Sequence, residues 1–143
     1  MAYLHENSMA AVFNNRVEKY RDKACVSYKK NGSYADISWF EMRDLVRGIA
    51  WFLLSKGVKK GDKVAIFSGN CYQWWVTDMA SMSVNAVDVP IYPTNSAKEA
   101  LYILENSEAS ICFAGNREQL SKILEVKDKL PGLKDIVAFE EPG

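Results

Sequence analysis

Two prolines, Pro90 and Pro93, bracket the region that holds our candidates for ligand contact, Tyr92 and Thr94. Each proline fixes its own φ and biases the preceding residue toward an extended conformation. The loop follows the apolar segment 87–91, which is typical of a strand. Because open α/β sheets bind ligands at the carboxyl ends of their strands, we predict that Tyr92 and Thr94 bind substrate. The alternative is that this loop is only a stiff connection.

The other reactive residue types do not assemble into a catalytic set. A phosphate-binding turn normally contains several glycines, whereas Phe-Ser-Gly-Asn at 67–70 has one and is typical of an ordinary strand-to-helix turn. Nucleophilic catalysis needs a base, and the sole histidine, His5, lies in a segment that we expect to fray. Asp88 interrupts an apolar strand, so we place it at the edge or end of the sheet, where a carboxylate meets water or a neighbouring loop. We therefore predict no catalytic residue.

Composition bounds the size of the folded unit and argues against one class of partner. The 143 residues suffice for one domain or a piece of a larger one, and 48% apolar residues can supply a core. Eighteen Lys and Arg balance eighteen Asp and Glu, and the two signs are interspersed. Nucleic-acid binding needs clustered cations, so we predict no nucleic-acid partner.

The cysteines and the apolar runs indicate a cellular compartment. Cys25, Cys71 and Cys112 are widely spaced and odd in number, which argues against a disulfide framework or a zinc site and suits a reducing environment. We predict no metal ligand, and we expect Cys112, within an apolar run, to behave as a small hydrophobe. The N-terminus lacks a signal-peptide pattern, and the longest wholly apolar run, Ile49 to Leu54, is too short to cross a bilayer. We expect a cytoplasmic location, with peripheral membrane contact left open.

The segments that must position the loop alternate between strand and helix from residue 63 onward. Consecutive apolar residues in the strands indicate burial on both faces, so we predict an α/β fold with a mostly parallel sheet and helices on both faces. Local sequence does not determine the order of the strands in the sheet. Numbering the four predicted strands from residue 63 onward in chain order, we expect the order 2-1-3-4. The predicted strands are 64–67, 87–91, 110–114 and 135–139; the predicted helices span 38–56 and 71–84 and start near 97 and 117.

A helix over 3–20 and a β-hairpin precede this sheet. Asn31-Gly32 between two short strands, 24–28 and 33–37, is a strong hairpin signal because both residues tolerate positive φ. We divide the chain into an arm, residues 1–40, and an α/β parallel-sheet subdomain, residues 41–143, both belonging to one larger domain.

Several local signals set the limits of the helices. Ser38 with Glu41 and Ser96 with Glu99 are capping boxes, and Asn116 with Gln119 also opens a helix. Gly57 and Asn85 supply left-handed ends. The helix after Ser38 has an apolar stripe that we expect to face the core: Met42, Leu45, Val46, Ile49 and Leu53.

Four motifs in order resemble the amino-terminal part of the acyl-adenylate-forming enzymes, over residues 9 to 139. No single motif is specific, but their order and spacing are. The Tyr-Pro-Thr ending most resembles the long-chain fatty-acid–CoA ligases (acyl-CoA synthetases), and the one visible departure is Asn85, where relatives usually carry glycine. The motifs are Ile-Ser-Trp-Phe-Glu at 37–41, Gly-Val-Lys-Lys-Gly-Asp-Lys-Val-Ala-Ile at 57–66, Asn70 with Trp74, and Val-Pro-Ile-Tyr-Pro-Thr at 89–94.

The resemblance implies a subdomain of the AMP-binding fold and an acid–thiol ligase reaction. Such enzymes use ATP and Mg²⁺ to convert a fatty acid to an acyl-adenylate, then transfer the acyl group to coenzyme A and release AMP and pyrophosphate. The family's phosphate loop, which ends in Pro-Lys-Gly, and its later motifs are absent from these 143 residues. We interpret the chain as the amino-terminal portion of a longer ligase: a scaffold, inactive alone, that binds none of these cofactors tightly.

Two other classes of function stay open. The first is a free-standing flavodoxin-like module that binds a nucleotide or flavin. The second is an oligomerisation domain that forms a homodimer through the 1–40 arm.

Overall fold

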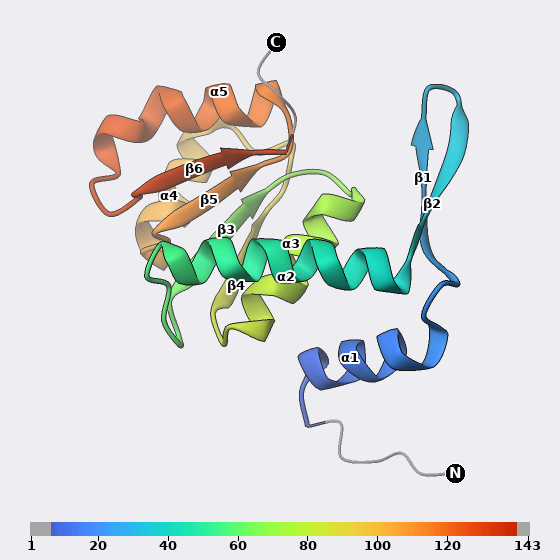
Figure 1. Cartoon of the computed structure of the whole chain (residues 1–143). Coiled ribbons are helices and arrows are strands. Elements are labelled where there is room, and N and C mark those ends of the chain that lie inside the picture. Colours follow the sequence, from blue (N-terminus) through green and yellow to red (C-terminus); the bar gives the residue numbers. More distant parts are fainter. Residues whose placement is uncertain (1–6, 140–143) are drawn as a thin grey trace.

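The structure is a computed structural model that describes residues 7–139, so His5 lies outside the described residues. Strands and helices alternate after the hairpin, as expected (Figure 1). The elements are α1 (Met9–Tyr20), β1 (Ala24–Lys30), β2 (Ser33–Ser38), α2 (Trp39–Ser55), β3 (Lys63–Phe67), α3 (Tyr72–Ser83), β4 (Val87–Ile91), α4 (Ala97–Ser107), β5 (Ile111–Ala114), α5 (Arg117–Val126), the short 3₁₀ helix η1 (Lys127–Lys129) and β6 (Asp135–Ala138).

The four later strands form one parallel sheet in the order β4-β3-β5-β6, which confirms the expected order. Helices α2 and α3 pack on one face, over side chains such as Val64 and Phe113. Helices α4 and α5 pack on the other face, over Ala65, Phe67 and Cys112. Because both faces are covered, the two central strands need consecutive apolar residues, as the sequence predicted.

The local signals form as predicted. Asn31 and Gly32 have φ of 51° and 83°, and they close the hairpin, which projects away from the sheet (Figure 1). Ser38 Oγ accepts from the Glu41 N–H at 3.2 Å, and the Ser38 N–H donates to Glu41 Oε2 at 2.7 Å. This backbone hydrogen bond lowers the pKa of Glu41 below its usual value. Gly57 has a φ of 80°, the left-handed conformation expected after a helix.

Two predictions about helices need correction. In the described part of the chain the first helix begins at Met9, because Ser8 caps it by accepting from the Ala11 N–H at 3.2 Å; positions 3–6 of the predicted helix lie outside the described residues. Leu45, expected in the buried stripe of α2, is 42% exposed. Its side chain lines an open groove between α2 and the end of β6, where nothing in the described residues covers it.

The N-terminal helix packs against the α/β part of the chain. Phe13 and Val17 of α1 are 5% and 1% exposed and belong to the same core cluster as α2 and α3. The ring of Phe13 lies 6.1 Å, centroid to centroid, from each of the rings of Trp39 and Trp75. Helix α1 therefore shares the core with Ile37 at the base of the hairpin, which is 8% exposed, whereas the tip of the hairpin projects away. The division at residue 40 stays a prediction.

Candidate functional site

The loops after β3 and β4 enclose a cavity of about 280 Å³ at the carboxyl edge of the sheet. This edge is where parallel sheets position ligand-binding residues. The cavity has a mixed aromatic and polar lining from the two loops and the first turn of α3. The lining residues are Ser68, Asn70, Trp74, Pro90, Ile91, Tyr92 and Pro93.

Strand β4 brings the proline-containing loop to this cavity. It is an edge strand, so Pro90 is tolerated although it lacks an N–H. Ile91, one residue later, is 2% exposed and anchors the strand end in the core. Tyr92 then turns outward and is 77% exposed, and the Asn95 N–H donates to the Tyr92 carbonyl at 3.0 Å to close a turn.

Two side chains of α5 hold the middle of this loop. Gln119 Nε2 donates to the Pro93 carbonyl at 3.3 Å, and Lys122 Nζ donates to the same oxygen at 3.4 Å. Gln119 is 3% exposed, and its Oε1 has no hydrogen-bond partner among the described residues. The rigidity of the loop thus comes from α5 as well as from its prolines.

Sequence reasoning missed this role of Gln119. The Asn116–Gln119 spacing predicts the start of a helix, and Asn116 Oδ1 accepts from the N–H groups of Glu118 and Gln119 at 2.8 and 3.2 Å. The side chain of Gln119, however, extends to Pro93, 26 residues earlier. A buried glutamine is the only local signal, and it does not identify the distant partner.

The two predicted substrate-binding residues differ in position. Tyr92 lines the cavity together with Trp74, whereas Thr94 is exposed and does not line it. A substrate-binding role for Tyr92 and Thr94 remains a prediction.

The turn after β3 has the geometry of an ordinary connection. Gly69 does not have positive φ, and a Cβ there would make only a 3.9 Å contact with Pro93 Cγ. The turn does not require glycine, and it is not a tight phosphate-binding cradle.

The loops after β3 and β5 contact each other at the point where the strand order reverses. The Gly115 N–H donates to the Phe67 carbonyl at 2.9 Å. A Cβ on Gly115 would lie 2.7 Å from Ser68 Cβ and 3.0 Å from Ser68 Cα. Flavodoxin-like sheets bind their ligand in the crevice at this reversal. Here the first residues of the two loops, Ser68 and Gly115, lie in contact at that reversal.

Asp88 has a partner that the sequence did not indicate. It lies on the edge strand β4, as predicted, and is half-buried near Asp78 of α3. Burial, and then the neighbouring Asp88 carboxylate, raise the pKa of Asp78 to about 6. A protonated Asp78 can donate a hydrogen bond to Asp88.

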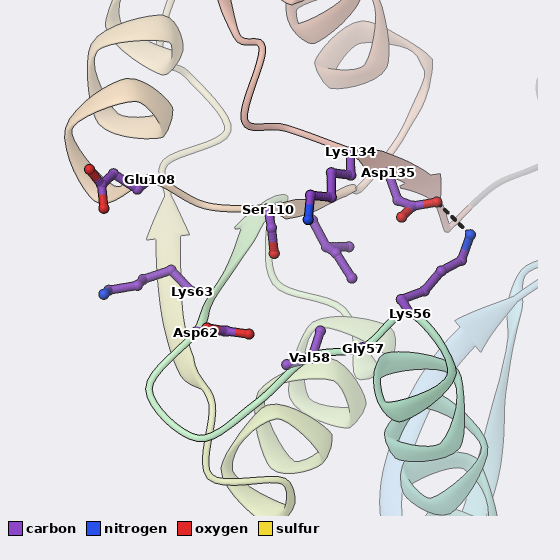
Figure 2. Close-up of a pocket in the computed structure, with 10 residues that line it drawn as sticks. Lys56, Gly57, Val58, Asp62, Lys63, Glu108, Ser110, Lys134 and Asp135 are labelled. Carbon is purple, nitrogen blue, oxygen red and sulfur yellow. Dashed lines mark hydrogen bonds and ion pairs between the residues drawn. The ribbon is translucent and has the colours of Figure 1, made fainter.

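A second, strongly polar pocket of about 210 Å³ lies at the opposite, amino edge of the sheet (Figure 2). Lys56 Nζ forms an ion pair with Asp135 Oδ1 at 2.6 Å, which links the end of α2 to β6. Figure 2 shows that the side chains of Lys63 and Lys134 point in different directions, so they do not converge on one anion. We interpret this pocket as a solvated, charge-balanced junction between elements.

Burial keeps the thiols of Cys25 and Cys112 protonated. Cys112 is fully buried, and burial raises the pKa of its thiol to about 12, as suits its predicted hydrophobic role. Burial also raises the pKa of Cys25 to about 11. Within residues 7–139, no three His, Cys, Asp or Glu residues are grouped so that they could hold a metal ion.

Sequence comparison identifies the protein family to which this chain belongs. A family model described as "AMP-binding enzyme" matches residues 13–142, so the chain belongs to the AMP-binding enzyme family. The long-chain-fatty-acid–CoA ligase FadD15 of Mycobacterium bovis is 33% identical over 141 residues, which are 97% of this chain and 23% of the relative. The ligase heimdall of Drosophila melanogaster is 30% identical over 134 residues, 91% of this chain and 20% of the relative.

Solved structures show the same fold. A fatty acyl CoA synthetase of Mycobacterium tuberculosis superposes with a TM-score of 0.82 at 20% identity, covering 92% of this chain and 26% of that one. A coronafacic acid ligase of Pectobacterium brasiliense gives a TM-score of 0.84 at 23% identity, covering 94% of this chain and 26% of that one. The chain spans less than a quarter of the length of FadD15 and of heimdall. Its fold is that of the N-terminal domain of FACL13 from Mycobacterium tuberculosis, with a TM-score of 0.82.

Proposed function

We propose that this chain is the amino-terminal part of an ATP-dependent long-chain fatty-acid–CoA ligase. The reaction joins a fatty acid to coenzyme A through an acyl-adenylate and releases AMP and pyrophosphate. The observation that carries this proposal is the 33% identity to a long-chain ligase over 97% of the chain.

The chain contributes a scaffold to this reaction, while ATP, Mg²⁺ and coenzyme A are bound mainly by the rest of the protein. The described residues position one candidate contact, Tyr92, beside a cavity on a loop anchored by α5. We propose that Tyr92 and Thr94 form part of the wall near the acyl or pantetheine path.

We also propose a cytoplasmic enzyme, whose arm of residues 1–40 offers a surface for homodimerisation. No helix in the described part of the chain has the length and apolar character needed to cross a membrane. We propose that any contact with a membrane is peripheral.

The test compares the complete gene product with the 143-residue chain. We expect the complete protein to release AMP only when ATP, coenzyme A and a long-chain fatty acid are all present, with acetate as the control substrate. The 143-residue chain should release none. The codons after Gly143 should encode a Ser/Thr/Gly-rich loop that ends in Pro-Lys-Gly.

Three results would contradict the proposal: turnover by the 143-residue chain alone, a complete protein without acyl-dependent AMP release, or tight saturable binding of FMN to the chain. Tryptophan fluorescence reports the last of these.

A further inference from the structure

The glutamine of α5 that reaches Pro93 occupies a helix position that packing alone would give to an apolar residue. Gln119, Ile123 and Val126 follow one another along the buried face of α5 and are 3%, 0% and 6% exposed. Residues at this spacing face the core together, and the other two are apolar. The polar side chain of Gln119 therefore needs an explanation beyond the packing of the helix.

The hydrogen bonding of this side chain contributes little to the stability of the fold. Its Nε2 donates to the Pro93 carbonyl at 3.3 Å, whereas its Oε1 has no hydrogen-bond partner among the described residues. An unpaired buried acceptor costs at least as much free energy as one neutral hydrogen bond contributes. The effect of Gln119 is instead to hold the Pro93 carbonyl in one direction.

That direction is the backbone variable that the prolines of the loop leave open. The ring of Pro93 fixes its own φ and biases Tyr92 toward an extended conformation. The ψ of Pro93 is not fixed by the ring, and it sets where the Pro93 carbonyl points and how the chain continues to Thr94. The Tyr92 carbonyl is held separately, because the Asn95 N–H donates to it at 3.0 Å. The hydrogen bond from Gln119 thus completes the definition of the loop conformation.

Lys122 is a weaker and shared support for the same carbonyl. Its Nζ lies 3.4 Å from the Pro93 oxygen but 2.6 Å from Glu118 Oε1, and it lies 5.8 Å from the centroid of the Phe67 ring. The ammonium group keeps these other partners when the loop moves. Pro93 is the only partner of the Gln119 side chain among the described residues, so the direction of the carbonyl depends mainly on Gln119.

The conformation of this loop determines the shape of the cavity of about 280 Å³ beside Tyr92. Tyr92 and Pro93 both line the cavity, and Tyr92 is 77% exposed. A side chain so exposed has few contacts to hold it, so its position depends on the backbone that carries it. A displacement of about 1 Å in a group that positions substrate can cost about a hundredfold in rate.

We propose that Gln119 is a positioning residue for Tyr92, the candidate substrate contact. Through the Pro93 carbonyl it fixes the loop of residues 92–95 at the cavity, and so sets the affinity of the enzyme for the substrate that enters there. This inference rests on the proposed function. A fatty acid and the pantetheine arm of coenzyme A both present a flexible linear chain, and separate kinetics for each distinguish them.

The experiment measures the kinetics and the thermal stability of the complete protein with Gln119→Met, which keeps an unbranched side chain and removes the amide. We expect the KM for a long-chain fatty acid or for coenzyme A to rise about fivefold, with kcat within about twofold and the KM for ATP unchanged. The Tm should not fall, because the unpaired acceptor is removed together with the hydrogen bond. A lower Tm with unchanged KM values would identify a purely structural role and overturn the proposal.

Ile123→Val is the matched control, one turn further along the same buried face. It removes one methylene from the core and should lower the Tm by about 1–3 °C while leaving every KM unchanged. A raised KM in this control would show that any disturbance of α5 reaches the cavity, which would also overturn the proposal. Gln119→Leu is a second apolar variant, in which we expect the same change in KM even where Gln119→Met packs poorly.

Hydrogen exchange gives a readout that does not depend on ligase activity. The Asn95 amide should exchange about tenfold faster in Gln119→Met than in the unmodified complete protein, while the amides of β5 should not change. Unchanged exchange at Asn95 would overturn the proposal.

The two readouts separate this inference from the proposed function. An unmodified complete protein without acyl-dependent AMP release would overturn the proposed function, whereas faster exchange at Asn95 in its Gln119→Met variant would still support the hold of Gln119 on the loop. An active protein whose Gln119→Met variant keeps its KM values retains the proposed function and loses this inference.

Discussion

At the scale of single residues, the pair Asp78 and Asp88 makes the fold sensitive to pH. The pKa of Asp78 is raised to about 6 in the folded state, from an unfolded value of 3.8. A raised carboxyl pKa means that the folded state binds its proton more tightly than the unfolded state does. The fold is therefore favoured below about pH 4, and this contribution is lost as the pH rises through 6.

Asp78→Asn should remove this dependence because an amide keeps the shape and carries no charge. Asp78 is partly exposed, so solvent screens the repulsion, and we expect a gain in the free energy of unfolding of about 1 kcal/mol at pH 7.5. The gain should vanish near pH 3.5. Urea unfolding at the two pH values measures it, with Asp128→Asn, an exposed carboxylate, as the control. A gain that is the same at both pH values would contradict this account.

At the scale of elements, the helix caps were predictable because each capping motif lies within four consecutive residues. Ser96 Oγ accepts from the Glu99 N–H at 3.3 Å, and the Ser96 N–H donates to Glu99 Oε2 at 2.7 Å. The same residue types would form this box in any α-helix. The contact between the loops after β3 and β5 is different, because Ser68 and Gly115 are brought together only by the pairing of their strands.

Gly115→Ala tests that contact. The added Cβ would lie 2.7 Å from Ser68 Cβ, so the two backbones must move apart, and we expect a loss of about 2 kcal/mol in the free energy of unfolding. Gly48→Ala is the matched control: a Cβ there has nothing within 4 Å, and alanine should stabilise α2 by about 0.5–1 kcal/mol. Chemical denaturation of both variants measures the difference. A neutral Gly115→Ala would show that the two loops separate easily.

At the scale of the whole molecule, apolar surface stays uncovered around α2. Leu45 lines the open groove on one side of this helix, and Trp51 and Leu54, which do not line the groove, are 73% and 49% exposed. Monomeric soluble proteins seldom leave large contiguous apolar surfaces open to water. The isolated chain should therefore associate in solution.

We expect the 143-residue chain to show a mass by light scattering that rises with concentration, and to bind an apolar-surface dye such as anilinonaphthalene sulfonate. The complete protein, with the surface covered, should bind less dye per mole. A clean monomer without dye binding would contradict this prediction.

Most of the fold, but little of the candidate site, follows from the order of residues along the chain. The consecutive apolar residues of 64–67 and 110–114, the Asn31-Gly32 turn and the capping boxes specify local conformation, because their physics acts within a few residues. The parallel sheet follows from their alternation. One departure was also local in origin, because Ser8 begins α1 later than its apolar stripe predicted.

The site depends instead on contacts between residues that are distant in sequence. Gln119 and Lys122 reach Pro93, Asp78 meets Asp88, Ser68 closes against Gly115, and Leu45 faces a groove instead of the core. Residue type and spacing along the chain determine which backbone conformations have low free energy. Which side chains share a cavity is set by how the strands order themselves and where the layers end, and that geometry arises only when the whole sheet has assembled.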